Sequence, residues 1–189
     1  MGVIDFIFPK KCLECGKEGK YICEDCIMKV GPGGPNSIWR YQGVVRKAII
    51  ALKYKFATEI ADELVSYINL PPSHNCLVPI PSHWYRQNIR GFNQAELLGE
   101  KLAVKMGWKF LPNLLVKTHP TPPQVGLKGT PRRQNLRGVF AVSPNILVSQ
   151  YPSIILFDDV LTTGSTLKEA SKVLKEAGVK KLWCLTIAR

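Results

Sequence analysis

The 189-residue sequence lacks any run of 18 or more apolar residues, the length that a membrane-spanning helix requires. The segment 1–8 is apolar, but it is too short for the hydrophobic region of a signal peptide and has no basic region before it. We therefore expect a cytoplasmic protein. Its apolar cluster of Ile4, Phe6, Ile7 and Phe8 leaves open a peripheral contact with the inner face of the cytoplasmic membrane.

Acidic residues are also few, with 14 Asp and Glu against 26 Lys and Arg and a net charge of +12. Such an excess favours an acidic polymer, a phosphorylated ligand or a membrane surface as partner. Charge that serves only solubility is the alternative, because net charge carries no specificity. Histidine is scarce too, and His83 and His119 lie in predicted loops, so the sequence offers no clear general base.

What the chain does contain is typical of a globular protein, with 46% hydrophobic and 21% charged residues. Its length suffices for one domain and a small appendage. The Pro- and Gly-rich segment 31–37 predicts a linker, which divides the chain into an N-terminal element (1–30) and a main domain (38–189).

Four of the six cysteines lie in the N-terminal element, as two Cys-x-x-Cys pairs separated by seven residues: Cys12, Cys15, Cys23 and Cys26. This spacing brings four thiolates around one tetrahedral Zn²⁺. Two disulfides or a redox dithiol are the alternatives. A cytoplasmic chain disfavours disulfides, and redox pairs normally occur singly, so we predict a structural zinc site.

Segment 154–166 contains the densest set of chemically useful side chains. The continuous apolar run 154–157 predicts a strand buried on both faces of a parallel sheet, and Asp158 and Asp159 are expected where it ends. A hydroxyl-rich turn comprises Thr162, Thr163, Gly164, Ser165 and Thr166. The apolar spacing that follows predicts a helix over 167–177, closed by a glycine.

This order of elements suits a phosphorylated sugar. The N-terminus of a helix attracts phosphate, and Gly164 lets the backbone approach it closely. The adjacent carboxylates Asp158 and Asp159 suit a sugar diol or a hydrated Mg²⁺. A ribose 5-phosphate would satisfy both parts. A simple turn with hydroxyl caps and solvated acids is the alternative.

Apolar periodicity and turn residues predict the remaining elements. The helices are expected at 45–56, at 60–68 and from the Asn93 cap to Gly107. The strands are expected at 38–42 (an edge strand), 77–81, 139–142 and 182–188, the last buried, with a hairpin or two short strands in 108–118. Together they predict an α/β fold with a parallel-sheet core and flanking helices.

Two predicted loops carry cations at positions where a ligand could bind. Loop 82–94 interleaves Arg86 and Arg90 with the rings of Trp84 and Tyr85, a combination that suits phosphates and stacked bases. Segment 119–138 is rich in proline, glycine and basic residues and predicts a mobile loop over the site. Its candidate phosphate contacts are Arg132, Arg133 and Arg137.

Segment 154–166 resembles the 5-phosphoribosyl-1-diphosphate (PRPP) motif of type I phosphoribosyltransferases. The resemblance implies that Asp158 and Asp159 hold the ribose hydroxyls of PRPP, with Mg²⁺, and that Thr162–Thr166 hold the 5-phosphate. In that family the loop after the first strand holds the diphosphate. Pro79 and Pro81 remove two N–H donors from this loop, so Arg86 and Arg90 are the better candidates.

The ordered set of motifs resembles the ComF/ComFC/GntX family along nearly the whole chain. The set comprises the four cysteines, Val-Pro-Ile-Pro, Arg-Gly-Phe-Asn-Gln-Ala-Glu, Thr-Pro-Pro-Gln-Val-Gly-Leu, Arg-Arg-Gln-Asn-Leu-Arg-Gly-Val-Phe and Phe-Asp-Asp-Val-Leu-Thr-Thr-Gly-Ser-Thr. This resemblance implies a zinc finger joined to a phosphoribosyltransferase-like domain. It also implies a role in natural competence, handling incoming single-stranded DNA with helicase and recombination partners.

Two functions of different classes remain open. One is a DNA-handling protein that uses its phosphoribosyltransferase-like domain to bind PRPP, which we favour. The other is an active phosphoribosyltransferase, in which Mg²⁺ and the loops hold diphosphate as the leaving group while positive charge grows at the ribose C1.

Overall fold

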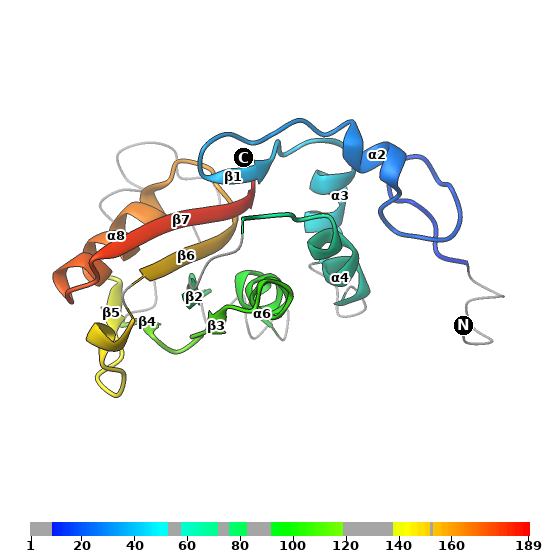
Figure 1. The fold of residues 1–189 in the computed structure, drawn as a ribbon. Coiled ribbons are helices and arrows are strands. Elements are labelled where there is room, and N and C mark those ends of the chain that lie inside the picture. Colours follow the sequence, from blue (N-terminus) through cyan, green and yellow to red (C-terminus); the bar gives the residue numbers. More distant parts are fainter. Residues whose placement is uncertain (1–8, 53–57, 72–75, 83–91, 119–137, 152) are drawn as a thin grey trace.

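The computed structural model describes residues 9–52, 58–71, 76–82, 92–118, 138–151 and 153–189. Its centre is a five-stranded sheet in the order β1-β7-β6-β2-β3, with every neighbouring pair parallel (Figure 1). The strands are β1 (Ser37–Trp39), β2 (Cys76–Pro79), β3 (Lys109–Phe110), β6 (Ser153–Val160) and β7 (Lys181–Ala188). A parallel sheet is covered on both faces. The apolar side chains of β6 alternate between the two faces and pack against the elements on each side.

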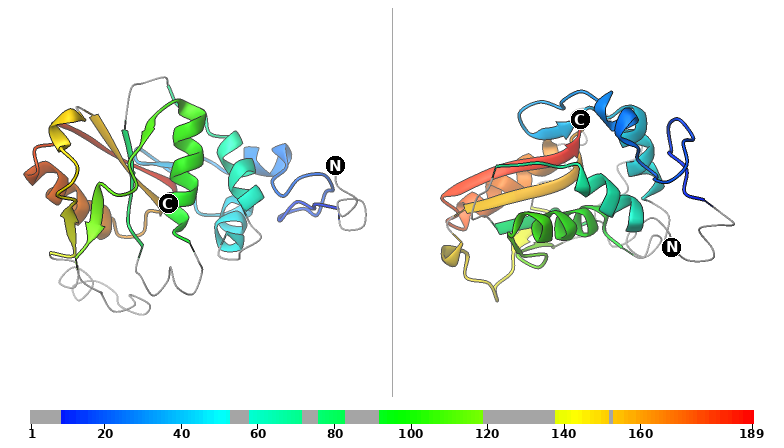
Figure 2. Two further views of the ribbon diagram at one scale, coloured as in Figure 1. Left: turned by 90° about the horizontal axis from the view of Figure 1, so that it is seen from below. Right: turned by 45° about the vertical axis from the view of Figure 1, so that its right-hand side comes forward.

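The apolar residues of β6 divide the core into two layers. Ile155 and Phe157 pack with helices α3 (Gly43–Ala51), α4 (Thr58–Ser66) and α6 (Gln94–Met106). Ile154 and Leu156 pack on the opposite face with α8 (Ser165–Glu176) and an antiparallel pair formed by β4 (Leu115–Lys117) and β5 (Phe140–Val142). Figure 2 shows α8 on one side of the sheet and α4 and α6 on the other. The predicted α/β class, with a parallel-sheet core and flanking helices, is confirmed.

The strand order creates a switch point between β2 and β6. From β2 the chain passes through α6 to β3 at one side of the sheet, whereas from β6 it passes through α8 to β7 at the other side. The two strands are neighbours, with Pro79 opposite Phe157. In open α/β sheets, ligands bind outside the carboxyl ends of the strands at such a point. The end of β6 is therefore the candidate binding position of this fold.

Several predicted elements take a different form in the structure. The edge strand begins at Ser37 and is shorter than expected. The segment 108–118 forms two separate strands, because β3 pairs with β2 and β4 pairs with β5. Strand β7 is buried only in its second half, and Trp183 is 55% exposed because the described helices on its face cover the other half of the strand.

Helix α6 has the boundaries that the sequence predicts. The Asn93 side chain caps its start by accepting a hydrogen bond from the Ala95 N–H, at 3.2 Å. The same side chain donates to the Ile80 carbonyl at 3.0 Å, which ties the helix to the chain after β2. Gly107 ends the helix in the left-handed conformation, with φ of 66°.

The N-terminal element packs against α3 and α4. Its short helix α2 (Glu24–Met28) contacts α3, and Ile22 is fully buried. The Ile22 N–H donates to Glu63 Oε2 at 2.8 Å, and the Tyr67 hydroxyl donates to the Ile22 carbonyl at 3.0 Å.

The short 3₁₀ helix η1 (Val148–Gln150) precedes β6. Among the described helices, none has the length and apolar character to cross a membrane.

Candidate functional site

The acidic pair lies inside β6, not after its end as the sequence suggested. Asp158 pairs in register with Thr186 of β7, and the strand continues to Val160. Both acids are half-buried. Each carboxylate accepts a hydrogen bond from the next backbone N–H, at 2.9 Å from Asp159 N to Asp158 Oδ1 and 2.7 Å from Val160 N to Asp159 Oδ1. These contacts hold the two carboxylates at the carboxyl edge of the sheet.

The electrostatics of this pair are unfavourable when no cation is bound. Burial, together with the neighbouring Asp159 carboxylate, raises the pKa of the Asp158 carboxyl well above its ordinary value. Hydrogen bonding from the Asp159 N–H and the charge of Lys117 oppose this rise in pKa. Two adjacent carboxylates of this kind would gain stability from a bound cation or from hydroxyl donors.

The turn after β6 presents a helix N-terminus without a side-chain cap. Gly164 is the N-cap of α8, with φ of 72°, and no side chain caps the helix in the usual way. Thr163 Oγ1 lies 2.8 Å from Ser165 Oγ and receives only a long contact, 3.4 Å, from the Ser165 N–H. The Leu161 N–H donates to the Ala188 carbonyl at 2.8 Å, which anchors the turn to the end of β7. The exposed turn and the acid pair therefore share one edge of the sheet.

The antiparallel pair β4–β5 brings a cation that sequence reasoning did not place in the site. Lys117 ends β4, opposite Phe140, and its charge acts on the Asp158 carboxyl. The pair is tied to α8 because the Gly138 N–H donates to Glu169 Oε1 at 3.1 Å. The only feature of the sequence that could have indicated this role is the position of Lys117 at the end of an expected strand, just before the basic segment 119–138.

The predicted cation and ring contacts of the two loops are not among the described residues. These are Trp84, Tyr85, Arg86 and Arg90 in one loop and Arg132, Arg133 and Arg137 in the other. The described residues next to each loop have defined contacts. The Ile80 N–H donates to the Phe157 carbonyl, next to Asp158, at 2.8 Å, and the Gly138 N–H donates to Glu169 of α8.

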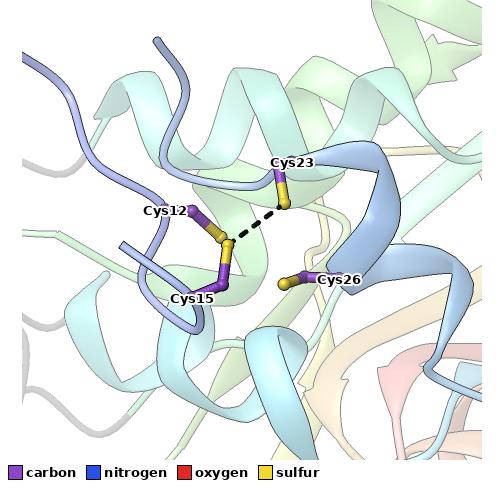
Figure 3. A group of neighbouring side chains, drawn as sticks. All are labelled: Cys12, Cys15, Cys23 and Cys26. Atoms are coloured by element: carbon purple, nitrogen blue, oxygen red, sulfur yellow. Dashed lines mark hydrogen bonds between the residues drawn. The ribbon is translucent and has the colours of Figure 1, made fainter. Parts of the chain in front are cut away.

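The four cysteines of the N-terminal element form one cluster, as Figure 3 shows. All four sulfur atoms lie within 4.8 Å of one another, and Cys15 Sγ is 3.6 Å from Cys23 Sγ. Four sulfurs at Zn–S distances of about 2.3 Å in a tetrahedron would be about 3.8 Å apart. The cluster thus has the composition and spacing that a metal ion such as zinc requires.

Two glycines and the first turn of α2 determine the path of the chain around the thiols. Gly16 and Gly19 have φ of 77° and 113°, which only glycine adopts readily, and they turn the chain between the two pairs. Cys23 is the N-cap of α2, and Cys26 is the third residue of that helix. Cys12, Cys23 and Cys26 are buried and Cys15 is exposed.

The thiols need a cation in order to ionise together. Burial disfavours ionisation of Cys12, but backbone N–H groups of Cys15, Cys23 and Glu14 lower the pKa of its thiol to about 6. Burial and contacts with the other three thiols raise the pKa of Cys26 to about 12. Four thiolates therefore coexist at neutral pH only if a bound metal supplies the missing charge.

The sequence is similar to bacterial proteins named for competence and DNA use. It is 29% identical over 195 residues to competence protein F of Haemophilus influenzae, covering 94% of this chain and 84% of the relative. It is 32% identical over 193 residues to the DNA utilization protein YhgH of Salmonella typhimurium, covering 92% and 82%. For competence protein ComFC of Bacillus subtilis the identity is 29% over 152 residues, covering 75% and 58%.

Two solved structures resemble this chain at low sequence identity. Adenine phosphoribosyltransferase from Thermoanaerobacter pseudethanolicus has a TM-score of 0.41 and 14% identity, covering 87% of this chain and 98% of that one. The glutamine PRPP amidotransferase of B. subtilis has a TM-score of 0.42 and 14% identity, covering 76% and 26%. No protein-family model matches the sequence. The similarity to YhgH over most of both chains, with competence protein F and ComFC beside it, shows that this chain belongs to the ComF/ComFC family.

Proposed function

We propose that the protein is a ComF-type competence factor that binds incoming single-stranded DNA and carries a PRPP site at the carboxyl end of β6. The names of its relatives support the competence role, and the net charge of +12 suits a polyanionic partner. The observation that carries the PRPP site is the placement of Asp158 and Asp159 beside the uncapped start of α8 at the switch point of the sheet. A helicase and a recombination protein are the partner classes expected in competence.

The site has complementary parts for each portion of PRPP. The carboxylates of Asp158 and Asp159 would accept hydrogen bonds from the ribose hydroxyls. The hydroxyls and N–H groups of Thr162–Thr166 would donate to the 5-phosphate, where the dipole of α8 favours negative charge. Lys117 and the arginines of the two loops would then balance the negative charge of the diphosphate.

Magnesium fits the same carboxylates. Mg²⁺ is usually held by one or two carboxylates together with the phosphates of its ligand and several waters. Asp158 and Asp159 provide the two carboxylates, and they lie close enough for the charge of one to raise the pKa of the other. Bound Mg²⁺ would neutralise charge on the diphosphate.

Isothermal titration calorimetry tests the PRPP site. The wild-type protein should bind PRPP in the presence of Mg²⁺, and the double variant Asp158→Asn/Asp159→Asn should bind little. Glu100→Gln, which removes an exposed acid on α6, is the matched control and should bind as the wild type does. Equal binding by the double variant would place the site elsewhere.

A second titration tests the DNA-binding part. Labelled oligothymidine should bind more tightly than duplex, with affinity that falls steeply as salt rises, because each phosphate neutralised on a single strand releases about 0.7 of a counterion. Arg86→Ala/Arg90→Ala should lower the salt slope by about 1 to 2, and Trp84→Ala should cost about 1–3 kcal/mol at constant slope. Tyr85 is the second candidate ring. No binding at low salt would refute this part of the proposal.

Phosphoribosyl transfer is the alternative activity, and it requires the same motif. An incubation of labelled PRPP with Mg²⁺ and either single-stranded DNA or nucleobases would distinguish phosphoribosyl transfer from PRPP binding alone. Diphosphate release that depends on an acceptor and on Asp158 would establish an enzyme. Binding without release would leave PRPP as a ligand of a DNA-handling protein.

A further inference from the structure

The exposed ring of Trp183 stands on a part of the sheet that the described helices do not cover. Along β7 the side chains alternate between the faces, and Leu185 and Ile187 pack on the α3–α6 side. Trp183 shares their face and lies opposite the buried Ile155 in register. It is nevertheless 55% exposed. Figure 2 shows the start of β7 with α8 behind it, whereas α3 and α4 lie toward the other end of the strand.

Two lysines accompany the ring. Lys181 projects on the same face of β7 two residues before Trp183, and Lys180 precedes it in the turn. Both are exposed, and neither makes an ion pair with another described residue. An exposed indole next to cations that pair with no described residue has the composition of a surface that stacks a base and contacts its phosphates.

The edge of β7 argues against a protein strand as the occupant. Strand β1 pairs with β7 only at Thr186 and Ala188, so the outer edge of residues 181–185 has no described partner. Lysines at such an edge disfavour the addition of a further strand. A second copy of this chain would also bring another net charge of +12. The charges on this surface therefore favour a polyanion.

We propose that Trp183, Lys180 and Lys181 form a second contact surface for single-stranded nucleic acid, in which the indole stacks on one base. This inference rests on the proposed DNA-binding function but uses a different part of the molecule. A parallel strand rises about 3.3 Å per residue, so Trp183 lies about 17 Å along β7 from Ala188 at the candidate PRPP site. PRPP should therefore leave this contact unaffected.

Anisotropy titrations of labelled oligothymidine test the surface. Trp183→Ala should weaken binding about 5- to 150-fold with an unchanged salt slope, and saturating PRPP with Mg²⁺ should not alter that ratio. Trp183→Phe keeps a ring and should retain most of the affinity. Lys180→Ala/Lys181→Ala should lower the slope by about 1.4. The control Met28→Ala/Lys29→Ala removes an exposed apolar residue and a lysine at the far end of the molecule and should leave binding unchanged.

Each contrary result has a separate meaning. If the wild type binds the oligonucleotide and Trp183→Ala binds equally well, the surface is not a DNA contact, while the proposed function stands. If the wild type does not bind at low salt, the proposed function itself fails. If Trp183→Ala changes the sedimentation of the protein alone, the surface joins copies of the chain and the inference is wrong.

Discussion

Removal of the metal from the N-terminal element should destabilise the whole protein, because the element shares the main hydrophobic core. Ile22, Ile27 and Val30 are 0%, 4% and 7% exposed and pack in the same cluster as α3 and α4. Burying such a side chain contributes about 1.5–3 kcal/mol, so exposure of all three would cost about 5–9 kcal/mol. A domain is typically stable by only about 5–15 kcal/mol in total.

The experiment compares the protein with its metal, after treatment with a strong zinc chelator, and with the substitution Cys26→Ser. Elemental analysis should first show about one zinc per chain, since the four sulfurs can satisfy one tetrahedral ion. Thermal unfolding followed by circular dichroism should then show a midpoint at least about 10 °C lower in both metal-free forms. Cys184→Ser, outside the cluster, is the control and should keep its zinc.

Three results would refute this reasoning. An unchanged main transition after complete zinc loss would mean that the core does not depend on the element. Two separate transitions, with only the smaller one sensitive to chelator, would mean that residues 1–30 fold as an independent unit before the 31–37 linker. Metal-free protein with four titratable thiols and an intact fold would also exclude a structural metal.

Substitutions at three further positions have predictable effects. Without added Mg²⁺, the pKa of Asp158 stays raised in the folded state, whereas in the unfolded state the carboxyl ionises near pH 4, so wild-type stability should fall as pH rises from about 4 toward the folded-state pKa. Asp158→Asn should flatten this dependence in calorimetry, and an equal slope would assign it to another group. A Cβ on Gly99 would lie 2.8 Å from Leu77 Cδ2, so Gly99→Ala should lose up to about 2 kcal/mol in urea unfolding despite its better helix propensity, and equal stability would show that the sheet can yield. Asn93→Ala loses both the cap of α6 and the bond to Ile80 and should cost about 1–3 kcal/mol, whereas Asn93→Asp should recover the cap alone; equal losses would contradict the capping role.

The features that depend on neighbours in sequence were predictable. The cysteine spacing predicted a cluster, the apolar run 154–157 predicted a buried strand, and Asn93 and Gly107 predicted the ends of a helix. Each signal acts within a few residues, through ligand geometry, side-chain alternation or backbone conformation. The structure confirms these elements close to their expected positions.

The features that depend on distant partners were not predictable. The acids lie within β6 because β7 continues to pair beside them, and this register is invisible in a local pattern. Trp183 belongs to an apolar strand, yet it is exposed because the described helices on that face cover only the rest of the strand. Lys117 reaches the acid pair through the β4–β5 pairing, which joins segments separated by more than 20 residues.

The pairing of β1 with β7 has a consequence for how the chain folds during its synthesis. Ser37 Oγ lies 2.6 Å from Thr186 Oγ1 although 149 residues separate them, and the Arg189 N–H donates to the Trp39 carbonyl at 3.0 Å. Such non-local contacts form slowly because a large loop must close first. An emerging chain therefore carries the cysteine cluster and β1 for most of its translation without the strand that completes the sheet. During that interval the unpaired edge of β1 is open to misassociation, and chaperones would act on it then.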